Sequence, residues 1–179
     1  IEHQTFDWES LCELVTPQNV LISRLLTPDL RQYSGKRLSE IATAMHKDWI
    51  ETMMDLVLTE HNRVETTYFM MDEANVRLNL QQPWMKIGTD AGAVDPGTFK
   101  GLVHPRALGT FPRILGRYAR DEKLMPLEEA VRKMTSATAT RLSLHDRGLL
   151  KPGMYADVVV FDPATIIDKA TYEEPVQVS

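Results

Sequence analysis

The chain has 179 residues, and 20 Lys and Arg against 25 Asp and Glu give it a formal net charge of −5. Its 43% hydrophobic and 25% charged residues are typical of a globular domain, which excludes a disordered, collagen-like or coiled-coil protein. The acidic balance argues against nucleic acid or an anionic membrane surface as the main partner, and no apolar run approaches the roughly 20 residues that span a bilayer.

The first third of the chain predicts a short strand followed by two amphipathic helices. The strand is expected at 20–22, where three apolar residues are consecutive. The first helix covers 38–45, and the second covers 50–58 with Asp48 as its N-cap residue. The apolar face expected for the second helix consists of Ile50, Met53, Met54, Val57 and Leu58.

A strand, a helix and a second strand are expected in the next stretch of about thirty residues. The run 64–70 is rich in β-branched and aromatic residues and predicts a strand, after which Asp72 is placed to cap a helix that ends before Pro83. A short strand follows at 84–89. This order is typical of a parallel βαβ unit, because parallel neighbours need a crossover helix between them.

Two further helices, followed by a strand that belongs to another domain, are expected in the second half of the chain. Residues 91–101 are too rich in Gly and Pro for a helix or strand, and a helix then opens at 110–112 with proline in its first turn. Another helix opens at Pro126, and a buried-type strand follows at 156–161, which places a domain boundary near 148. The helix after Pro126 is expected to bury Leu127, Ala130, Val131 and Met134.

Asp90 directly follows the strand expected at 84–89. In open α/β sheets and β/α barrels, the carboxyl ends of the strands bind ligands and present catalytic side chains. Aspartate is also common in ordinary turns and helix caps, because its side chain hydrogen-bonds nearby backbone groups. Position alone favours the ordinary turn and keeps the catalytic interpretation open.

Arg106 lies in a His-Pro-Arg sequence downstream of the glycine-rich loop. Its planar guanidinium group matches the two oxygens of a carboxylate, so Arg106 is a candidate to bind a substrate carboxylate. A surface arginine, or one paired with Asp95 or Asp90 inside the loop, is an equally good interpretation. His104 is a candidate supporting donor or a simple hydrogen-bonding residue.

The remaining histidines and the single cysteine give no metal motif. His3, His46, His61 and His145 show neither an H-x-H nor a Cys/His spacing, so the sequence contains no recognisable zinc set of its own. Cys12 excludes an internal disulfide and favours a reducing compartment, so we expect a cytoplasmic protein.

Several segments of the chain, among them 35–41 and 68–71, resemble the N-acyl-D-amino-acid deacylase (D-aminoacylase) family of the amidohydrolase superfamily. The most specific is the H-P-R-A-L-G-T-F-P-R sequence at 104–113, which is typical of the deacylase branch. The I-G-T-D sequence at 87–90 and the E-E-A-V-R-K-M-T-S sequence at 128–136 are also similar to that family. Residues 146–163 resemble the segment in which the chain of superfamily members passes from the barrel back into the small β domain.

The resemblance implies an α/β fold, namely a metal-dependent (β/α)8 barrel with a small β-sandwich domain. Such a barrel takes about 250 residues, so this chain is too short to form one alone, and the resemblance implies that it corresponds to the C-terminal part. Residues 1–147 would be the last part of the catalytic barrel, and 148–179 part of the sandwich. By the same resemblance, most metal ligands precede these residues, so the 179 residues alone are expected to be inactive and to need the remainder of their own polypeptide.

The resemblance also implies roles for two residues. Asp90 matches the family aspartate that takes a proton from the attacking water and passes it to the departing amine, and it is also a candidate metal ligand. Arg106 matches the arginine that binds the α-carboxylate of the substrate. The expected metal is zinc, the substrate is a small N-acyl-D-amino acid, and the products are a D-amino acid and a carboxylate.

Two alternatives remain open at this point. Another amidohydrolase activity, on a cyclic or different N-acyl amide, would have no use for Arg106 if its substrate lacked a carboxylate. A catalytically inactive binding or structural module would be indicated by loss of Asp90 or Arg106, and both are present.

Overall fold

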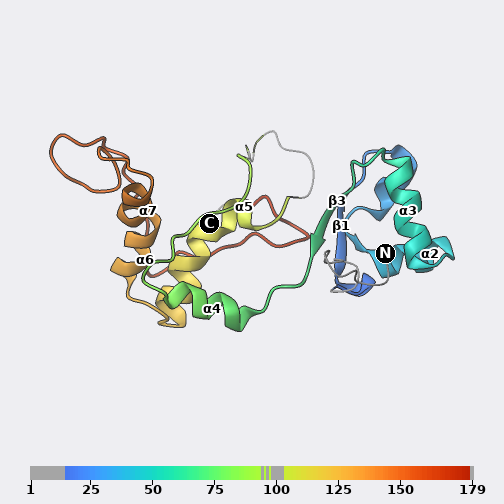
Figure 1. The fold of residues 1–179 in the computed structure, drawn as a ribbon, viewed down its shortest axis with the longest axis horizontal. Helices are drawn as coiled ribbons and strands as arrows, with labels where there is room; N and C mark the ends of the chain where they lie inside the picture. The colour runs from blue at the N-terminus through green and yellow to red at the C-terminus, as the bar shows by residue number, and fades with distance from the viewer. Residues whose placement is uncertain (1–14, 94, 96, 98–102, 178–179) are drawn as a thin grey trace, which may run out of the picture. The chain divides into compact units, whose positions relative to one another are not determined.

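A computed structural model of the chain describes residues 15–93, 95, 97 and 103–177, which form two units (Figure 1). The first unit extends to Met71 and the second begins at Asp72. Cys12 and part of the glycine-rich loop lie outside the described residues. No helix in the described residues has the length and apolar character needed to span a membrane.

The first unit contains a three-stranded antiparallel sheet with β1 between β2 and β3. Leu21 lies opposite Arg37 on one side and Thr67 on the other, and the register with β3 shifts between Ile22 and Arg24. The strands predicted at 20–22 and within 64–70 are therefore confirmed. In chain order, the elements of this unit are the 3₁₀-helix η1 (Pro17–Asn19), β1 (Val20–Arg24), the 3₁₀-helix η2 (Pro28–Tyr33), β2 (Lys36–Arg37), α2 (Leu38–Met45), α3 (Trp49–Thr59) and β3 (Glu65–Tyr68).

Helices α2 and α3 pack against this sheet and close an apolar core (Figure 1). Both helices were predicted, and Asp48 caps α3 as expected, with its Oδ1 accepting a hydrogen bond from the Ile50 backbone N–H at 2.8 Å. The apolar face predicted for α3 is correct in part, because Met53 and Val57 line the apolar interior of this unit. Leu58, which was expected on that face, is 69% exposed, whereas Leu56 is buried. The buried core of the unit consists of Val15, Val20, Ile22, Leu25, Leu38, Ile41 and Leu56.

A buried carboxylate closes the loop that follows β1. Glu60, at the C-terminal end of α3, accepts hydrogen bonds from the backbone N–H groups of Leu26 at 2.8 Å and Thr27 at 2.7 Å. Burial acts to raise the pKa of Glu60, but these hydrogen bonds and the nearby charge of Arg63 together outweigh it, and the net pKa lies below its usual value. Glu60 therefore holds the end of the strand to the end of the helix as an ionised group.

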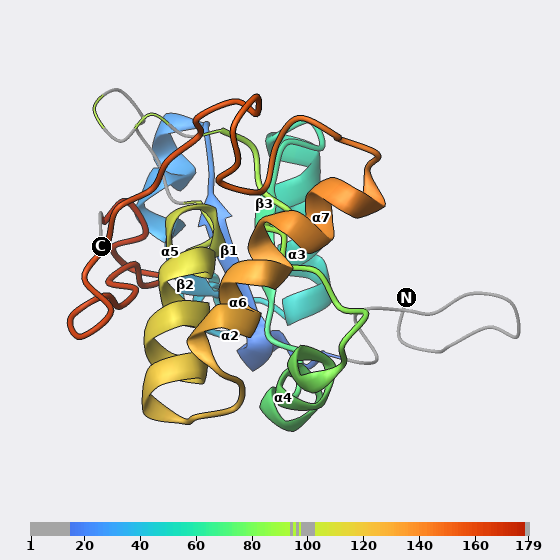
Figure 2. The same cartoon turned by 90° about the vertical axis from the view of Figure 1, so that its left-hand side faces the viewer.

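Among the described residues of the second unit, the regular elements are all helices, and irregular segments lie between and after them. Figure 2 shows α6 beside the continuous helix formed by α5 and η3. The helix capped by Asp72 is confirmed, with Asp72 Oδ1 accepting from Ala74 N at 2.6 Å. The elements are α4 (Glu73–Gln81), α5 (Arg106–Arg113), the π-helix η3 (Ile114–Asp121), α6 (Leu127–Met134) and α7 (Ser136–Arg141).

The strand predicted at 84–89, and with it the parallel βαβ unit, is wrong in this structure. Residues 82–93 are irregular, and the strand before α4 pairs antiparallel with β1 instead. A short apolar run becomes a strand only beside a hydrogen-bonding neighbour, and no described strand lies next to 84–89. Ile87 instead packs into the second core with Ile114, Leu115 and Tyr118.

The strand predicted at 156–161 is also absent from the described structure. Its central side chains, Val159 and Val160, are 84% and 91% exposed, although their sequence is typical of a buried strand. The physical reason is the same as for 84–89, because the described residues supply no partner strand.

The helix predicted to open at 110–112 begins earlier, at Arg106. Pro112 therefore lies inside the helix, where it has no N–H to donate to the carbonyl four residues earlier. The helix continues past this point as the π-helix η3, a wider geometry in which the hydrogen-bond register is shifted. The helix predicted from Pro112 is therefore confirmed, but its predicted first residue is wrong.

Helix α6 begins after Pro126 as predicted and contributes a buried lysine that the sequence did not indicate. Ala130 is buried as expected, whereas Val131 is exposed. Lys133 is buried instead, and its Nζ donates hydrogen bonds to the carbonyl oxygens of Leu80 and Gln82 at the end of α4. A lysine thus caps the C-terminus of α4, where the helix leaves carbonyl groups without partners.

Candidate active site

Asp90 and Arg106, the two predicted site residues, form an ion pair in the second unit. Arg106 Nη2 lies 2.9 Å from Asp90 Oδ2. Asp90 lies in the irregular segment after α4, with a left-handed backbone conformation (φ 48°), and its side chain is 90% exposed. Arg106 is the first residue of α5 and its side chain is 43% exposed.

The exposure of this pair limits what it contributes to folding. An exposed ion pair is worth about 0–1 kcal/mol, because water screens both charges. The pairing agrees with the simple interpretation of Arg106 as a loop contact and equally with a substrate site, since both place Arg106 beside Asp90. Its weakness means that another carboxylate can replace Asp90 at the guanidinium group at little cost in stability.

His104 supports the first turn of α5, on which Arg106 lies. Its Nδ1 accepts a hydrogen bond from the Arg106 backbone N–H at 3.1 Å, and its carbonyl oxygen accepts one from Ala107 N at 3.0 Å. Pro105, the N-cap residue, has no side-chain acceptor of its own. Partial burial, followed by the nearby charge of Arg106, lowers the pKa of His104 and favours its neutral form.

Tyr172 packs against His104 from the C-terminal segment. Its hydroxyl oxygen lies 3.4 Å from His104 Nε2, and the two rings meet edge to face with centroids 5.2 Å apart. Sequence reasoning did not identify Tyr172, because 68 positions separate it from His104 and no motif links them.

The segment that carries Tyr172 follows the α5–η3 helix in the antiparallel direction (Figures 1 and 2). Gly116 lies against Ile166, so closely that a Cβ at position 116 would be 2.3 Å from the Ile166 carbonyl oxygen. Further along, a Cβ at Gly109 would lie 3.2 Å from Asp168 Cβ. The two glycines, seven positions apart on the helix, let this segment approach the helix backbone and reach His104.

A zinc site cannot be built from the described residues alone. Among them, no cluster of three or more His, Cys, Asp or Glu side chains is arranged to hold a metal ion. Asp90 is a single carboxylate paired with an arginine, whereas zinc sites use three or four protein ligands. The residues present therefore do not fit a zinc ion without ligands from elsewhere.

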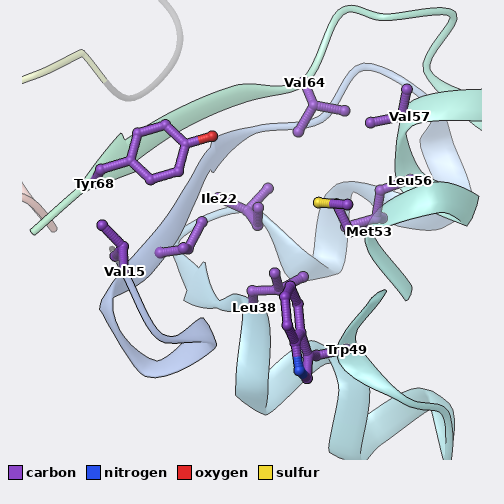
Figure 3. Close-up of a pocket in the computed structure, with 10 residues that line it drawn as sticks. Val15, Ile22, Leu38, Trp49, Met53, Leu56, Val57, Val64 and Tyr68 are labelled. Carbon is purple, nitrogen blue, oxygen red and sulfur yellow. The ribbon is translucent and has the colours of Figure 1, made fainter. Parts of the chain in front are cut away.

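A cavity of about 40 Å³ lies in the first unit between β1, β3 and the helices (Figure 3). Its lining contains no carboxylate, imidazole, amine or thiol, so it offers none of the usual catalytic acids, bases or zinc ligands. We interpret it as a packing gap in the apolar core. The side chains around it are Val15, Val20, Ile22, Leu38, Trp49, Met53, Leu56, Val57, Val64 and Tyr68.

Comparison with known proteins gives a consistent result. The chain matches the model of the amidohydrolase family over residues 35–178. It is 44% identical over 146 residues to a D-aminoacylase of Alcaligenes xylosoxydans xylosoxydans, a match that covers 82% of this chain and 28% of that protein. It is 45% identical over 141 residues to an N-acyl-D-glutamate deacylase of the same organism, covering 79% of this chain and 27% of the relative.

The solved structure of an N-acyl-D-glutamate deacylase from Bordetella bronchiseptica is also similar. That protein is complexed with zinc and a phosphonate inhibitor that mimics the tetrahedral intermediate of its reaction. It matches with a TM-score of 0.78 at 36% identity, covering 91% of this chain and 32% of the other. The chain therefore spans less than a third of the length of these relatives.

Proposed function

The chain belongs to the amidohydrolase family and has its α/β fold, and we propose that the complete protein hydrolyses N-acyl-D-amino acids to a D-amino acid and a carboxylate. The observation that carries the proposal is the pairing of Asp90 with Arg106 at 2.9 Å, within a chain 44% identical to a D-aminoacylase. One group can transfer protons and the other can bind a carboxylate, and this substrate class needs both.

Arg106 binds the α-carboxylate of the substrate in this proposal. Its guanidinium group holds one carboxylate, that of Asp90, and its planar donors suit a bidentate contact. A substrate carboxylate that takes this place releases Asp90 from the pair. Binding at Arg106 thereby frees the carboxylate that acts on the scissile amide.

Asp90 transfers the proton. It accepts a proton as water attacks the amide carbonyl, and it delivers a proton to the nitrogen as the C–N bond breaks. The exposed, irregular segment that carries Asp90 leaves its oxygens accessible to both groups. Without this transfer the amine would have to depart as an anion, which is a very poor leaving group.

The resemblance to the amidohydrolases also suggests how the chain is divided into domains and which metal the complete protein binds. We propose that residues 1–147 contribute to a (β/α)8 barrel and 148–179 to a small β-sandwich, with a boundary near 148. The exposed valines at 159 and 160 support this division, because a sandwich strand would cover them. We also propose zinc as the metal of the complete protein, as in the Bordetella bronchiseptica complex, with Asp90 as a candidate ligand and the other ligands outside the described residues.

The proposal covers N-acyl-D-amino acids with any side chain. Identity to the D-aminoacylase is 44% and identity to the N-acyl-D-glutamate deacylase is 45%, so overall likeness favours neither. The substrate we propose is therefore the class of N-acyl-D-amino acids with a free α-carboxylate.

The test is enantioselective hydrolysis by the complete protein. Release of methionine from N-acetyl-D-methionine and N-acetyl-L-methionine is measured on a sample whose intact mass and zinc content are determined in parallel. We expect release from the D-substrate only, and stoichiometric zinc. Equal rates on both enantiomers, or no release by a zinc-loaded sample, would refute the proposal.

A further inference from the structure

A line of contacts leads from the C-terminal segment to the proposed carboxylate-binding arginine. Tyr172 touches His104, His104 binds the backbone of Arg106, and Arg106 pairs with Asp90. We infer that Tyr172 and His104 are positioning residues that set how Arg106 receives a substrate carboxylate. The inference rests on the proposed function and assigns a role to two residues that do not themselves contact the reacting atoms.

The two ring nitrogens of His104 have separate tasks. Nδ1 accepts the Arg106 N–H, so it carries no proton. In a neutral imidazole the proton is then on Nε2, which points at the Tyr172 hydroxyl oxygen 3.4 Å away. The contact with Tyr172 therefore holds the tautomer and ring orientation in which Nδ1 faces Arg106.

The backbone of Arg106 depends on this acceptor. The first N–H groups of a helix have no partner inside the helix, and Pro105 cannot supply one from its side chain. His104 provides two acceptors, Nδ1 for Arg106 and its own carbonyl for Ala107. A shift of His104 would rotate the first turn of α5 and move the origin of the Arg106 side chain.

The segment behind Tyr172 is held firmly enough to act as a support. It is fixed to the α5–η3 helix by the ion pair between Arg113 Nη1 and Asp168 Oδ2 at 2.8 Å. Beyond it, Thr171 and Glu174 form a turn through two hydrogen bonds, Thr171 N to Glu174 O at 3.1 Å and Glu174 N to Thr171 Oγ1 at 2.9 Å. Tyr172 lies within this turn, so its ring is presented to His104 from a fixed backbone.

Positioning predicts a specific kinetic signature for Tyr172→Phe in the complete protein. The variant keeps the ring but loses the hydroxyl, so we expect KM for N-acetyl-D-methionine to rise about threefold to tenfold, the effect of one lost hydrogen bond. Both kcat and the activity on N-acetyl-D-methioninamide, which has no carboxylate, stay within about twofold. The matched control is Tyr155→Phe, an exposed tyrosine that is outside this line of contacts, and it leaves KM unchanged.

Two substitutions at His104 separate its two contacts. In His104→Asn the amide oxygen takes the place of Nδ1 and keeps the acceptor for Arg106, while the contact with Tyr172 is lost. In His104→Gln the terminal amide takes the place of Nε2 and the acceptor is lost. We expect His104→Gln to raise KM more than His104→Asn, and Tyr172→Phe added to His104→Asn to have no further effect.

Amide hydrogen exchange tests the same positioning without activity. We expect the peptide that contains the Arg106 N–H to exchange at least about threefold faster in Tyr172→Phe than in the wild type or Tyr155→Phe. Unchanged exchange, or equal loss of activity on the carboxylate and carboxamide substrates, would overturn the inference while leaving the deacylase proposal intact. A wild-type protein inactive on both substrates would overturn the deacylase proposal, and the exchange result would still decide whether Tyr172 positions Arg106.

Discussion

In the first unit the residues that hold the fold together are buried, whereas the two residues proposed to act on the substrate, both in the second unit, are exposed. Leu56 is 1% exposed in the first core, and the Asp90 side chain is 90% exposed. Burial of apolar area stabilises a fold, and exposed charge contributes little to it. Stability and activity should therefore respond to different substitutions.

The largest expected effect is on turnover by Asp90→Asn in the complete protein. Asparagine cannot accept the proton, so we expect kcat to fall by about a thousandfold, within the usual contribution of acid–base catalysis. The backbone at Asp90 is left-handed, a conformation that asparagine tolerates well, and the ion pair is exposed. The free energy of unfolding should change by less than about 0.5 kcal/mol.

Steady-state kinetics and thermal unfolding of the same sample check both halves of this expectation. A variant that retains more than about a tenth of the wild-type kcat would remove Asp90 from the reaction. A variant that is inactive because it unfolds would break the separation between stability and activity.

The next effect is on stability, through Leu56→Ala compared with Leu58→Ala on the same helix. Leu56 is buried and Leu58 is 69% exposed, while both substitutions change helix propensity equally. We expect Leu56→Ala to lower the free energy of unfolding by about 3 kcal/mol and Leu58→Ala by less than about 0.5 kcal/mol. Urea unfolding measures both, and equal losses would show that the buried face of α3 is not the one described.

This pair of leucines also shows why the sequence predicted α3 but only part of its buried face. Periodicity fixes that a helix forms, and the apolar residues of α3 are frequent enough to define two overlapping faces. The choice between them is made by tertiary contacts, because Leu56 meets β1 and α2 in the core whereas Leu58 faces water. No local pattern contains that information.

An intermediate effect is expected for Arg106→Ala in the complete protein. Loss of a charged hydrogen-bonding partner for the substrate carboxylate costs about 1.5–3 kcal/mol, so kcat/KM for N-acetyl-D-methionine should fall by about ten- to a hundredfold. Activity on N-acetyl-D-methioninamide should fall much less. Equal losses on both substrates would argue against carboxylate binding and favour an amidohydrolase whose substrate lacks a carboxylate.

In the candidate site, too, tertiary packing decides a contact that the sequence does not predict, here between residues 68 positions apart. Asp90, His104 and Arg106 lie within a span short enough for motifs to identify them, and the structure brings them together. Tyr172 reaches His104 only because Gly109 and Gly116 allow the C-terminal segment to lie along the helix. That approach depends on three-dimensional packing, so no spacing in the sequence predicts it.

A smaller effect is expected for Glu60→Gln in the first unit. Glutamine can accept only one of the two hydrogen bonds from Leu26 and Thr27, so we expect a loss of about 1–2 kcal/mol at neutral pH. The pKa of Glu60 is lowered in the folded chain, so its contribution to the free energy of unfolding is complete above the usual pKa of 4.5 and is lost as the pH falls through the folded pKa.

Urea unfolding of wild type and Glu60→Gln at several pH values should show the two free energies of unfolding converging in acid. A difference that persists or grows in acid would contradict this assignment.

The two strands predicted wrongly share a physical cause. Runs 84–89 and 156–161 have strand composition, but a strand is a property of a pair, since its backbone groups need a neighbour. β1 and β3 satisfy this within the first unit, where each was predicted from composition and each finds the other. The sequence thus predicts a tendency to form a strand, and the available partners decide whether one is made.

The smallest effect is expected for Val160→Ala, and it tests that conclusion directly. Val160 is 91% exposed in this chain, so the substitution should change the free energy of unfolding by less than about 0.5 kcal/mol. If the complete protein supplies a partner strand and buries Val160 in a sandwich, the same substitution there should cost about 1–3 kcal/mol. Unfolding measured in both settings, with exposed Lys151→Ala as the control, separates the two cases. Equal small effects would refute the sandwich assigned to 148–179, whereas a cost confined to the complete protein would show that the missing neighbour, and not the sequence of the segment, leaves these valines exposed.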